Sequence, residues 1–224
     1  MKLPGYFGCC AAFAVVGVGG PPAPGRPADD GSKPLPPPRL SGPMSLEEAV
    51  NSRRSVREFA TRPLTAEQLS QLCWAGQGIT EPRTGLRAAP SAGALYPIEL
   101  YLVTAEGVDQ YVPHRHALTR HKEGDVRSSL QAACLDQECV GQASLAVVIA
   151  AVESRTARKY GQRAERYCLI EAGHVAQNIL LQAVALGLGG VPVGACDDAK
   201  VARVLDLPKD HAVLYVLAVG QPKK

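Results

Sequence analysis

The chain has 224 residues, of which 46% are hydrophobic and 20% are charged. These proportions are typical of one folded domain with enough apolar residues for a sizeable core. The formal net charge of +3 is too small to indicate nucleic acid or an acidic membrane as a partner. An aromatic content of 5% also argues against a stacking surface for single-stranded nucleic acid.

The N-terminal part of the chain differs in composition from the rest. Residues 1–20 carry Lys2 before a short apolar run of small residues, which fits either a signal peptide or an unstructured leader and is too short to span a membrane. We therefore expect a cytoplasmic protein, with export as the alternative if residues 1–20 act as a signal. Residues 21–43 are rich in Pro and Gly and predict a linker, so the folded domain is expected over residues 44–224.

A cluster of arginines follows the first predicted helix. Ser45 and Glu48 have the spacing of a capping box, which predicts a helix that ends close to residue 53. We call the next set the arginine segment: Arg53, Arg54, Ser55 and Arg57. Guanidinium forks and a hydroxyl match phosphate oxygens, so the segment indicates an anion site. The alternative is that the arginines satisfy the last carbonyls of the helix.

A second stretch consists almost entirely of small residues. We call it the small-residue loop, and its members are Pro90, Ser91, Ala92, Gly93, Ala94 and Leu95. The alternating pattern that starts at Ile98 predicts a strand directly after it. Small side chains let a backbone approach a flat ligand closely, although a plain turn before a strand would look similar.

Together, RRSVREF and PSAGALYPIELYLV resemble the nitroreductase family, and specifically its SagB-type (azoline oxidase-like) dehydrogenase branch. Further matches begin at Lys159 (KYG), Glu171 (EAGHVAQN), Leu186 (LGLGGVPVG) and Val219 (VGQP). The resemblance extends from about Leu35 to the C-terminus. It implies an α+β fold with a small, mostly antiparallel sheet surrounded by helices, and a long central helix at the interface of a homodimer.

The resemblance also implies FMN as the cofactor. The arginine segment would hold the phosphate, the ribityl chain and the pyrimidine edge of the ring, and the small-residue loop would line the isoalloxazine from the other subunit. Backbone donors near flavin N5 and the dimethylbenzene side would come from what we call the glycine segment: Gly190, Val191, Pro192, Val193 and Gly194.

The reaction class follows from the cofactor, because hydride enters and leaves a flavin at N5. SagB-type relatives oxidise azolines in small molecules or peptides, and Lys159 and Tyr160, the Lys–Tyr pair, match residues associated with that chemistry. In this role the pair would remove a proton from carbon as general base and relay. The alternatives are an NAD(P)H-dependent reductase of nitroaromatics or quinones, a non-catalytic flavin-binding protein, and a Lys–Tyr pair that lies in solvent.

Cysteines and histidines indicate neither a disulfide framework nor a metal site. Four cysteines lie in apolar helical patterns and are expected to be buried small side chains, namely Cys73, Cys134, Cys139 and Cys168. Three histidines occupy a polar stretch that predicts a solvated loop, because no ligand spacing completes them: His114, His116 and His121.

The remaining elements follow from caps and periodicity. Thr65 and Gln68 predict a second capped helix, Asp125 is expected to cap a helix as far as Cys139, and Asp197 one through Leu205. Residues 145–152 and 213–219 predict strands. Residues 163–186 predict a helix that is apolar on nearly every face, which is typical of a central or interface helix. Its polar members are expected to be partnered core groups: His174, Gln177 and Asn178.

Overall fold

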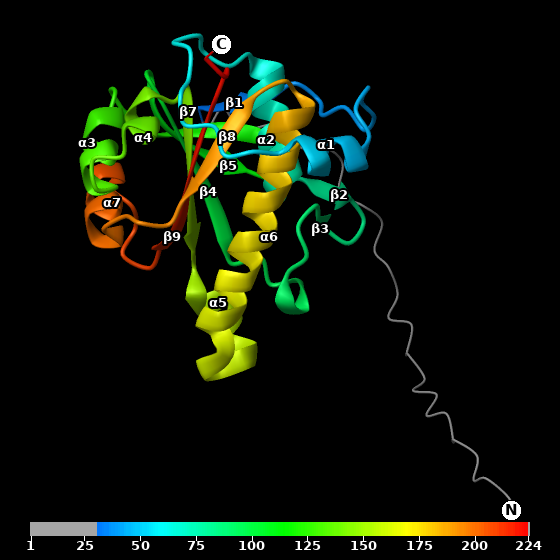
Figure 1. Ribbon diagram of the computed structural model, residues 1–224. Helices are drawn as coiled ribbons and strands as arrows, with labels where there is room; N and C mark the ends of the chain where they lie inside the picture. The colour runs from blue at the N-terminus through cyan, green and yellow to red at the C-terminus, as the bar shows by residue number, and fades with distance from the viewer. Residues whose placement is uncertain (1–30, 224) are drawn as a thin grey trace, which may run out of the picture. The chain divides into compact units, whose positions relative to one another are not determined.

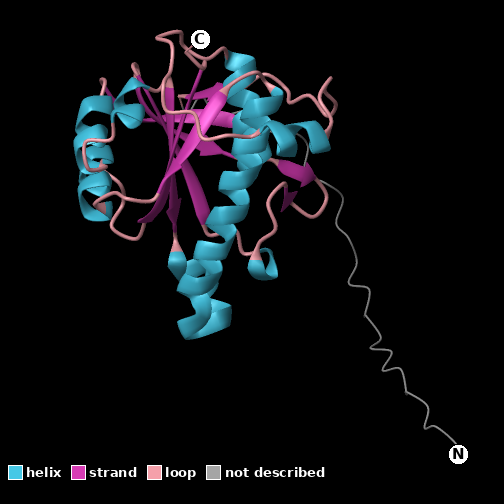
Figure 2. Cartoon of the chain, in the orientation of Figure 1, coloured by secondary structure: helices cyan, strands magenta, loops and turns pink. Residues whose placement is uncertain are grey.

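The computed structural model describes residues 31–223, so the predicted leader, residues 1–20, and residues 21–30 lie outside the described residues. The described part is one compact unit built on a seven-stranded sheet (Figures 1 and 2). The strand order is β1-β6-β5-β4-β7-β9-β8, and every paired strand is antiparallel. The strands are β1 (Ser32–Pro34), β4 (Ile98–Thr104), β5 (Gly107–Val112), β6 (Ala117–Glu123), β7 (Leu145–Ala151), β8 (Gly189–Val193) and β9 (Ala212–Gly220), with β2 (Ile79–Glu81) and β3 (Leu86–Arg87) in a separate hairpin.

Helices cover both faces of this sheet, which confirms the predicted α+β nitroreductase-like fold, although the sheet is larger than expected (Figure 1). The helices α1, α2 and α6 lie on one side, and α3, α4 and α7 lie on the other. Their bounds are α1 (Leu46–Ser52), α2 (Ala66–Gln77), α3 (Arg127–Ala133), α4 (Glu138–Gln142), α5 (Glu153–Tyr160), α6 (Ala164–Ala185) and α7 (Asp198–Leu205), with short 3-10 turns η1 (Ala92–Ala94) and η2 (Gly161–Arg163).

The side chains of β7 show how the two faces are filled. All seven residues of this strand are buried, as predicted for an apolar run between two layers. Val147 and Ile149 belong to the core under α2 and α6, whereas Val148 and Ala150 belong to the core under α3, α4 and α7. Successive residues of a strand point to opposite faces, so one strand contributes to both cores.

Both predicted capping boxes are confirmed, at Ser45 with Glu48 and at Thr65 with Gln68. Asp197 also caps α7 as predicted, because its side chain accepts a hydrogen bond from the backbone of Lys200. The prediction at Asp125 was wrong in two respects. Its carboxylate binds the backbone and guanidinium of Arg127 instead of acting as the N-cap, and the helix stops at Ala133, before a separate α4 begins.

Part of the predicted linker is folded into the domain. Within residues 21–43, Ser32–Pro34 pair with β6 as an edge strand. The backbone nitrogen of Arg39 donates to the side chain of Gln71 on α2, which donates back to the carbonyl of Arg39. Prolines do not prevent this arrangement, because an edge strand leaves one row of its backbone groups unpaired.

Most of the histidine stretch belongs to a β-hairpin of β5 and β6, so the predicted solvated loop is confirmed only for the exposed turn that carries His114. His116 and His121 have partners within the domain. His116 lies between the hydroxyls of Ser70 (2.7 Å) and Tyr111 (2.8 Å), and His121 contacts the carbonyl of Leu205 at 2.9 Å. Between residues 31 and 223 no group of His, Cys, Asp and Glu is arranged to hold a metal ion. None of the helices in that range has the length and hydropathy needed to cross a membrane.

Candidate functional site

The arginine segment leaves α1 in an extended conformation and is largely exposed. One Arg54 nitrogen donates to the carbonyls of Asn51 (2.9 Å) and Arg53 (2.8 Å), which is the helix-end role that the sequence left open. The guanidinium groups of Arg53 and Arg57 make no hydrogen bond or ion pair within residues 31–223. Two cationic groups are therefore free to bind an anion from solution.

The glycine segment lies beside the arginine segment. Gly190 bridges Ser55, and its carbonyl accepts a hydrogen bond from the backbone of Val56 (3.1 Å). The neighbouring Gly189 permits this approach, because a methyl group there would lie 2.7 Å from the Cβ of Val56. Since β8 is the last strand of the sheet, no strand pairs with its outer edge beyond this bridge, where the outward-facing residues are Pro192, which has no N–H, and Gly194.

The small-residue loop meets the Lys–Tyr pair within the same chain. Gly93 has φ +63, and a methyl group on it would lie 2.9 Å from the hydroxyl of Tyr160 and 3.0 Å from the amine of Lys159. Glycine is suited to this position both by its left-handed conformation and by the lack of space for a side chain. Two motifs separated by more than sixty residues therefore form one cluster.

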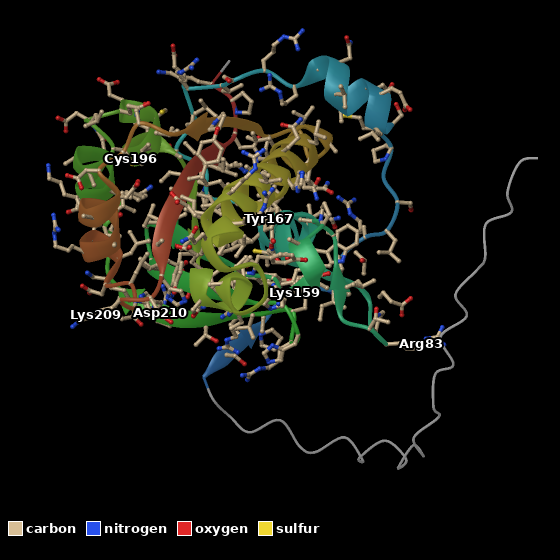
Figure 3. All side chains as sticks on the ribbon, turned by 90° about the horizontal axis from the view of Figure 1, so that it is seen from below. Arg83, Lys159, Tyr167, Cys196, Lys209 and Asp210 are labelled. Carbon is tan, nitrogen blue, oxygen red and sulfur yellow. A yellow bond between two sulfur atoms is a disulfide. The ribbon has the colours of Figure 1, made fainter. Side chains whose placement is uncertain are left out.

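Aromatic contacts fix one member of the Lys–Tyr pair more firmly than the other. The ring of Tyr160 packs edge-on against Tyr167, with a centroid distance of 4.8 Å, and the Lys159 amine lies 5.5 Å from the Tyr160 ring centroid. The side chain of Lys159 is nevertheless exposed in the single chain. It lies with Tyr167 at the end of the molecule formed by α5 and the start of α6 (Figure 3).

A buried polar group behind the loop was missed by the sequence analysis. Glu171 on α6 is only 2% exposed, and burial raises the pKa of its carboxyl to about 7, against the opposing effects of Ser91, Gln77 and Arg87. The available signal was its helix position, because Glu171 shares a face with Cys168 and Val175, which are both buried. A glutamate on an otherwise buried helix face indicates a polar role in the core.

The polar residues predicted for the core of α6 behave differently from one another. Asn178 is partnered as expected, since its side-chain nitrogen donates to the carbonyl of Ala75 at 3.1 Å. His174 and Gln177 are exposed, so their placement in the core was wrong. They lie on one face with Ile170, which is 44% exposed, because residues four and seven positions apart share a helix face.

The predicted site residues form two groups at different ends of α6. The small-residue loop and the Lys–Tyr pair lie near its start, where Glu171 faces Ser91. The glycine segment lies near its end, since a methyl group on Gly190 would be 2.8 Å from Leu180. Nine to sixteen residues of helix separate these points, roughly 15–25 Å along the axis. A large cavity of about 1010 Å³ contains none of the predicted residues and lies between Phe59, Leu118 and Lys223.

One cysteine prediction was also wrong. Cys134, expected to be free, forms a disulfide with Cys196, because the end of α3 lies against the loop that precedes α7. The cysteines at 73, 139 and 168 are free and buried, as predicted. Cys196 follows the glycine segment by two residues, and its place beside α7 is visible in Figure 3.

Comparison with known proteins identifies the sequence family and the fold. A family model described as the nitroreductase family matches residues 50–221. A Methanocaldococcus jannaschii protein described as a nitroreductase is 41% identical over 184 residues, which cover 80% of this chain and 91% of that protein. The crystal structure of a Ralstonia eutropha protein described as a nitroreductase superposes with a TM-score of 0.79 at 30% identity, covering 87% of this chain and 91% of that one.

Two further relatives have more specific names. The microcin B17-processing protein McbC of Escherichia coli is 30% identical over 57% of this chain and 51% of its own length. An NADPH-flavin oxidoreductase of Vibrio harveyi is 27% identical over 78% of this chain and 65% of its own length. The chain thus spans about half to two thirds of the length of these two relatives.

Proposed function

Because the chain belongs to the nitroreductase family, we propose that it is an FMN-dependent oxidoreductase of the SagB-type branch, acting as a homodimer with two composite sites. One observation carries this proposal: the arginine segment lies beside the glycine segment on β8. Free guanidinium groups next to the outer edge of the last strand suit a phosphate-bearing ligand with a polar ring edge.

The chain's own residues fit FMN in their chemistry. Arg53 and Arg57 would hold the phosphate and the pyrimidine edge, with Ser55 as a further donor, and the glycine segment would approach the ring without side-chain obstruction. When bound, FMN would supply hydride acceptance or donation at N5. Arg54 would contribute less than its neighbours, because part of its guanidinium is already hydrogen-bonded to the end of α1.

A homodimer accounts for the separation of the two groups of site residues. Within one chain they lie at different ends of α6, so a second copy is needed to bring the small-residue loop to the ring bound by the arginine segment. The single chain exposes large apolar side chains on α1 and α6 that a partner would cover, namely Leu46 (66%), Val50 (55%), Leu169 (50%) and Ile170 (44%).

The proposed substrate is a small-molecule or peptide azoline, which the McbC similarity supports. Tyr160 and Lys159 would move the proton that leaves carbon as hydride passes to the flavin. A second candidate, reduction of nitroaromatics or quinones by NAD(P)H, is favoured by the similarity to the Vibrio harveyi enzyme. Anaerobic mixing with NADPH separates the two, because only the reductase should lose its flavin colour promptly. We also propose that the protein is located in the cytoplasm.

Replacing the free guanidinium groups tests the proposed FMN site. We expect Arg53→Ala and Arg57→Ala to fold normally and to bind FMN about 10- to 150-fold more weakly, since each loses a charge-assisted contact of about 1.5–3 kcal/mol. Fluorescence titration of the apoprotein measures the dissociation constant. Arg83→Ala is the matched control, because Arg83 is 94% exposed in its side chain and lies at the far margin of the molecule (Figure 3). Unchanged affinity in both test variants would refute the assignment.

A further inference from the structure

A buried donor and a buried acceptor lie unused behind the small-residue loop. Neither the Oε1 atom of Glu171 nor the Nε2 atom of Gln77 has a hydrogen-bond partner in the described part of the chain. Both residues are nearly inaccessible, with exposures of 2% and 1%. Unsatisfied polar atoms at such depth are uncommon in folded proteins and call for an explanation, such as a functional role.

The orientation of Gln77 is fixed by its other contact. Its Oε1 atom accepts a hydrogen bond from the Arg87 guanidinium at 2.7 Å. Reversing the amide would place its NH₂ group against that cation, so the nitrogen must point elsewhere. The Gln77 nitrogen therefore needs a different acceptor. The Glu171 carboxylate is the candidate, because Gln77 lowers the pKa of that carboxyl.

The groups that face Glu171 come from four parts of the fold. Arg87 on β3 is the cation that faces it, while Gln77 on α2 and Ser91 in the loop are uncharged. On α6 itself, the Cys168 thiol is the titratable neighbour, and that thiol interacts with Thr156 on α5 at 3.8 Å. Desolvation keeps the carboxyl protonated to higher pH than usual, and the polar neighbours favour its ionised form.

Ser91 connects the carboxyl to the loop. Its hydroxyl oxygen accepts a hydrogen bond from the backbone of Tyr96 at 2.9 Å, which leaves the hydroxyl hydrogen for Glu171. The Tyr96 hydroxyl accepts from the backbone of Arg87 at 3.0 Å, and the Arg87 guanidinium lies 4.5 Å from the Tyr96 ring centroid. Ser91 at the start of the loop and Tyr96 directly after it are thus both tied to groups that face Glu171. Gly93, which lies against the Lys–Tyr pair, is between them.

We propose that Glu171 is a positioning residue that acts through Ser91 on the small-residue loop and so sets the placement of Lys159 and Tyr160. As a carboxylate it would accept hydrogen bonds from Ser91 and from the Gln77 Nε2 atom, which has no other partner in the described part of the chain, and would so hold the loop. In its protonated form it would have one acceptor fewer and would release the Ser91 hydroxyl, which frees the loop. The proposal deepens the proposed function, because the positioned pair is the one assigned to proton transfer, but its structural content does not require a flavin.

The test uses the full-length protein without substrate or flavin. Hydrogen exchange of a peptide covering residues 91–96, corrected for intrinsic rates, is followed between pH 5.5 and 8.5, roughly 1.5 units either side of the carboxyl's midpoint of about 7. Competitive acetylation of Lys159 relative to exposed Lys209 is measured on the same samples. We expect protection of the loop and the labelling ratio to change together, with a midpoint near pH 7.

Three variants decide the outcome. In Glu171→Gln the step should disappear, and in Ser91→Ala it should disappear although the carboxyl is retained. Glu165→Gln, exposed on the same helix, should keep the step of the parent protein. A step that persists in Glu171→Gln, or no step in the parent, would overturn the proposal, and Ser91→Ala carries the test if Glu171→Gln does not fold. A protein that shows the step yet binds no FMN would refute the proposed function alone.

Discussion

Glu171 illustrates how one side chain couples stability to pH. Its carboxyl keeps a proton to about pH 7 in the folded chain, whereas the unfolded chain titrates near the ordinary value of 4.5. Between these values the folded state binds more protons than the unfolded state. The contribution of this group to the free energy of unfolding is therefore greatest below pH 4.5, and it decreases as the pH rises toward 7.

The first consequence concerns Glu171→Gln, which cannot ionise. We expect the free energy of unfolding of the parent protein to fall relative to this variant between pH 4.5 and about 7, by up to ~3 kcal/mol. Urea denaturation at a series of pH values measures the difference, and Glu165→Gln serves as the control. Parallel curves for the parent and Glu171→Gln would mean that the carboxyl titrates normally.

At the scale of single residues, sequence reasoning identified side chains better than it identified their partners. The resemblance named Lys159 and Tyr160 as a pair, but the contact with Gly93 depends on a left-handed backbone that brings η1 to α5. Glu171 begins one of the matched motifs, but the sequence predicted no role for it, since its importance comes from burial by α2, β3 and the loop. Such surroundings are set by tertiary packing and are not encoded in local spacing.

Among the secondary-structure elements, the end of α3 is linked covalently to the loop that precedes α7. The Cys134–Cys196 disulfide closes a loop with a sequence separation of 62 residues and ties down the segment that follows the glycine segment. A cross-link of this span lowers the entropy of the unfolded chain. The backbone of Asp197 also donates to the carbonyl of Ala133 at 2.8 Å, so the two elements remain in contact without the bond.

Removing this cross-link should destabilise the domain without unfolding it. We expect Cys134→Ser/Cys196→Ser to lower the free energy of unfolding by about 2–4 kcal/mol, measured by urea denaturation without reductant. Adding dithiothreitol should lower the stability of the parent protein by a similar amount and leave the double variant unchanged. Equal stability of the unreduced parent and the variant would indicate that the two thiols do not cross-link in solution.

Elements with strong local signals were predicted, and elements that depend on distant partners were not. The capping boxes located α1 and α2, and the continuous apolar run located β7, because caps and fully buried strands are visible in a short window. The hairpin of β5 and β6 was missed, since its histidines and charged residues obscure the alternation. Its histidines are partnered by Tyr111 within the hairpin and by Ser70 and the end of α7, and the last two are distant in sequence.

On the scale of the whole molecule, the proposed composite site of a homodimer makes a prediction that a single-chain site does not. We expect Arg53→Ala/Arg57→Ala to lack flavin, and Lys159→Ala/Tyr160→Phe to keep it while losing turnover on the order of 10²–10⁴-fold. Each homodimer is then inactive. A mixed dimer contains one site in which the arginine segment and the Lys–Tyr pair are both intact.

Mixing the two variants under conditions that exchange subunits should therefore restore activity. Random exchange makes half of the dimers mixed, each with one intact site out of two, so about a quarter of the parent activity is expected. The controls are each variant exchanged with itself, which should remain inactive. A mixture with no activity, in which exchange is verified by differently tagged subunits, would place both groups of residues in the same chain's site.

The most direct measurement is the visible absorption spectrum of the purified protein, followed by anaerobic reduction. We predict flavin absorption, release of FMN on denaturation as identified by mass spectrometry, and reversible bleaching by dithionite. Transfer of hydride from an azoline should bleach the same band and yield the corresponding azole. A colourless protein that takes up no FMN when dialysed against an excess of it would contradict the assignment of an FMN-dependent oxidoreductase.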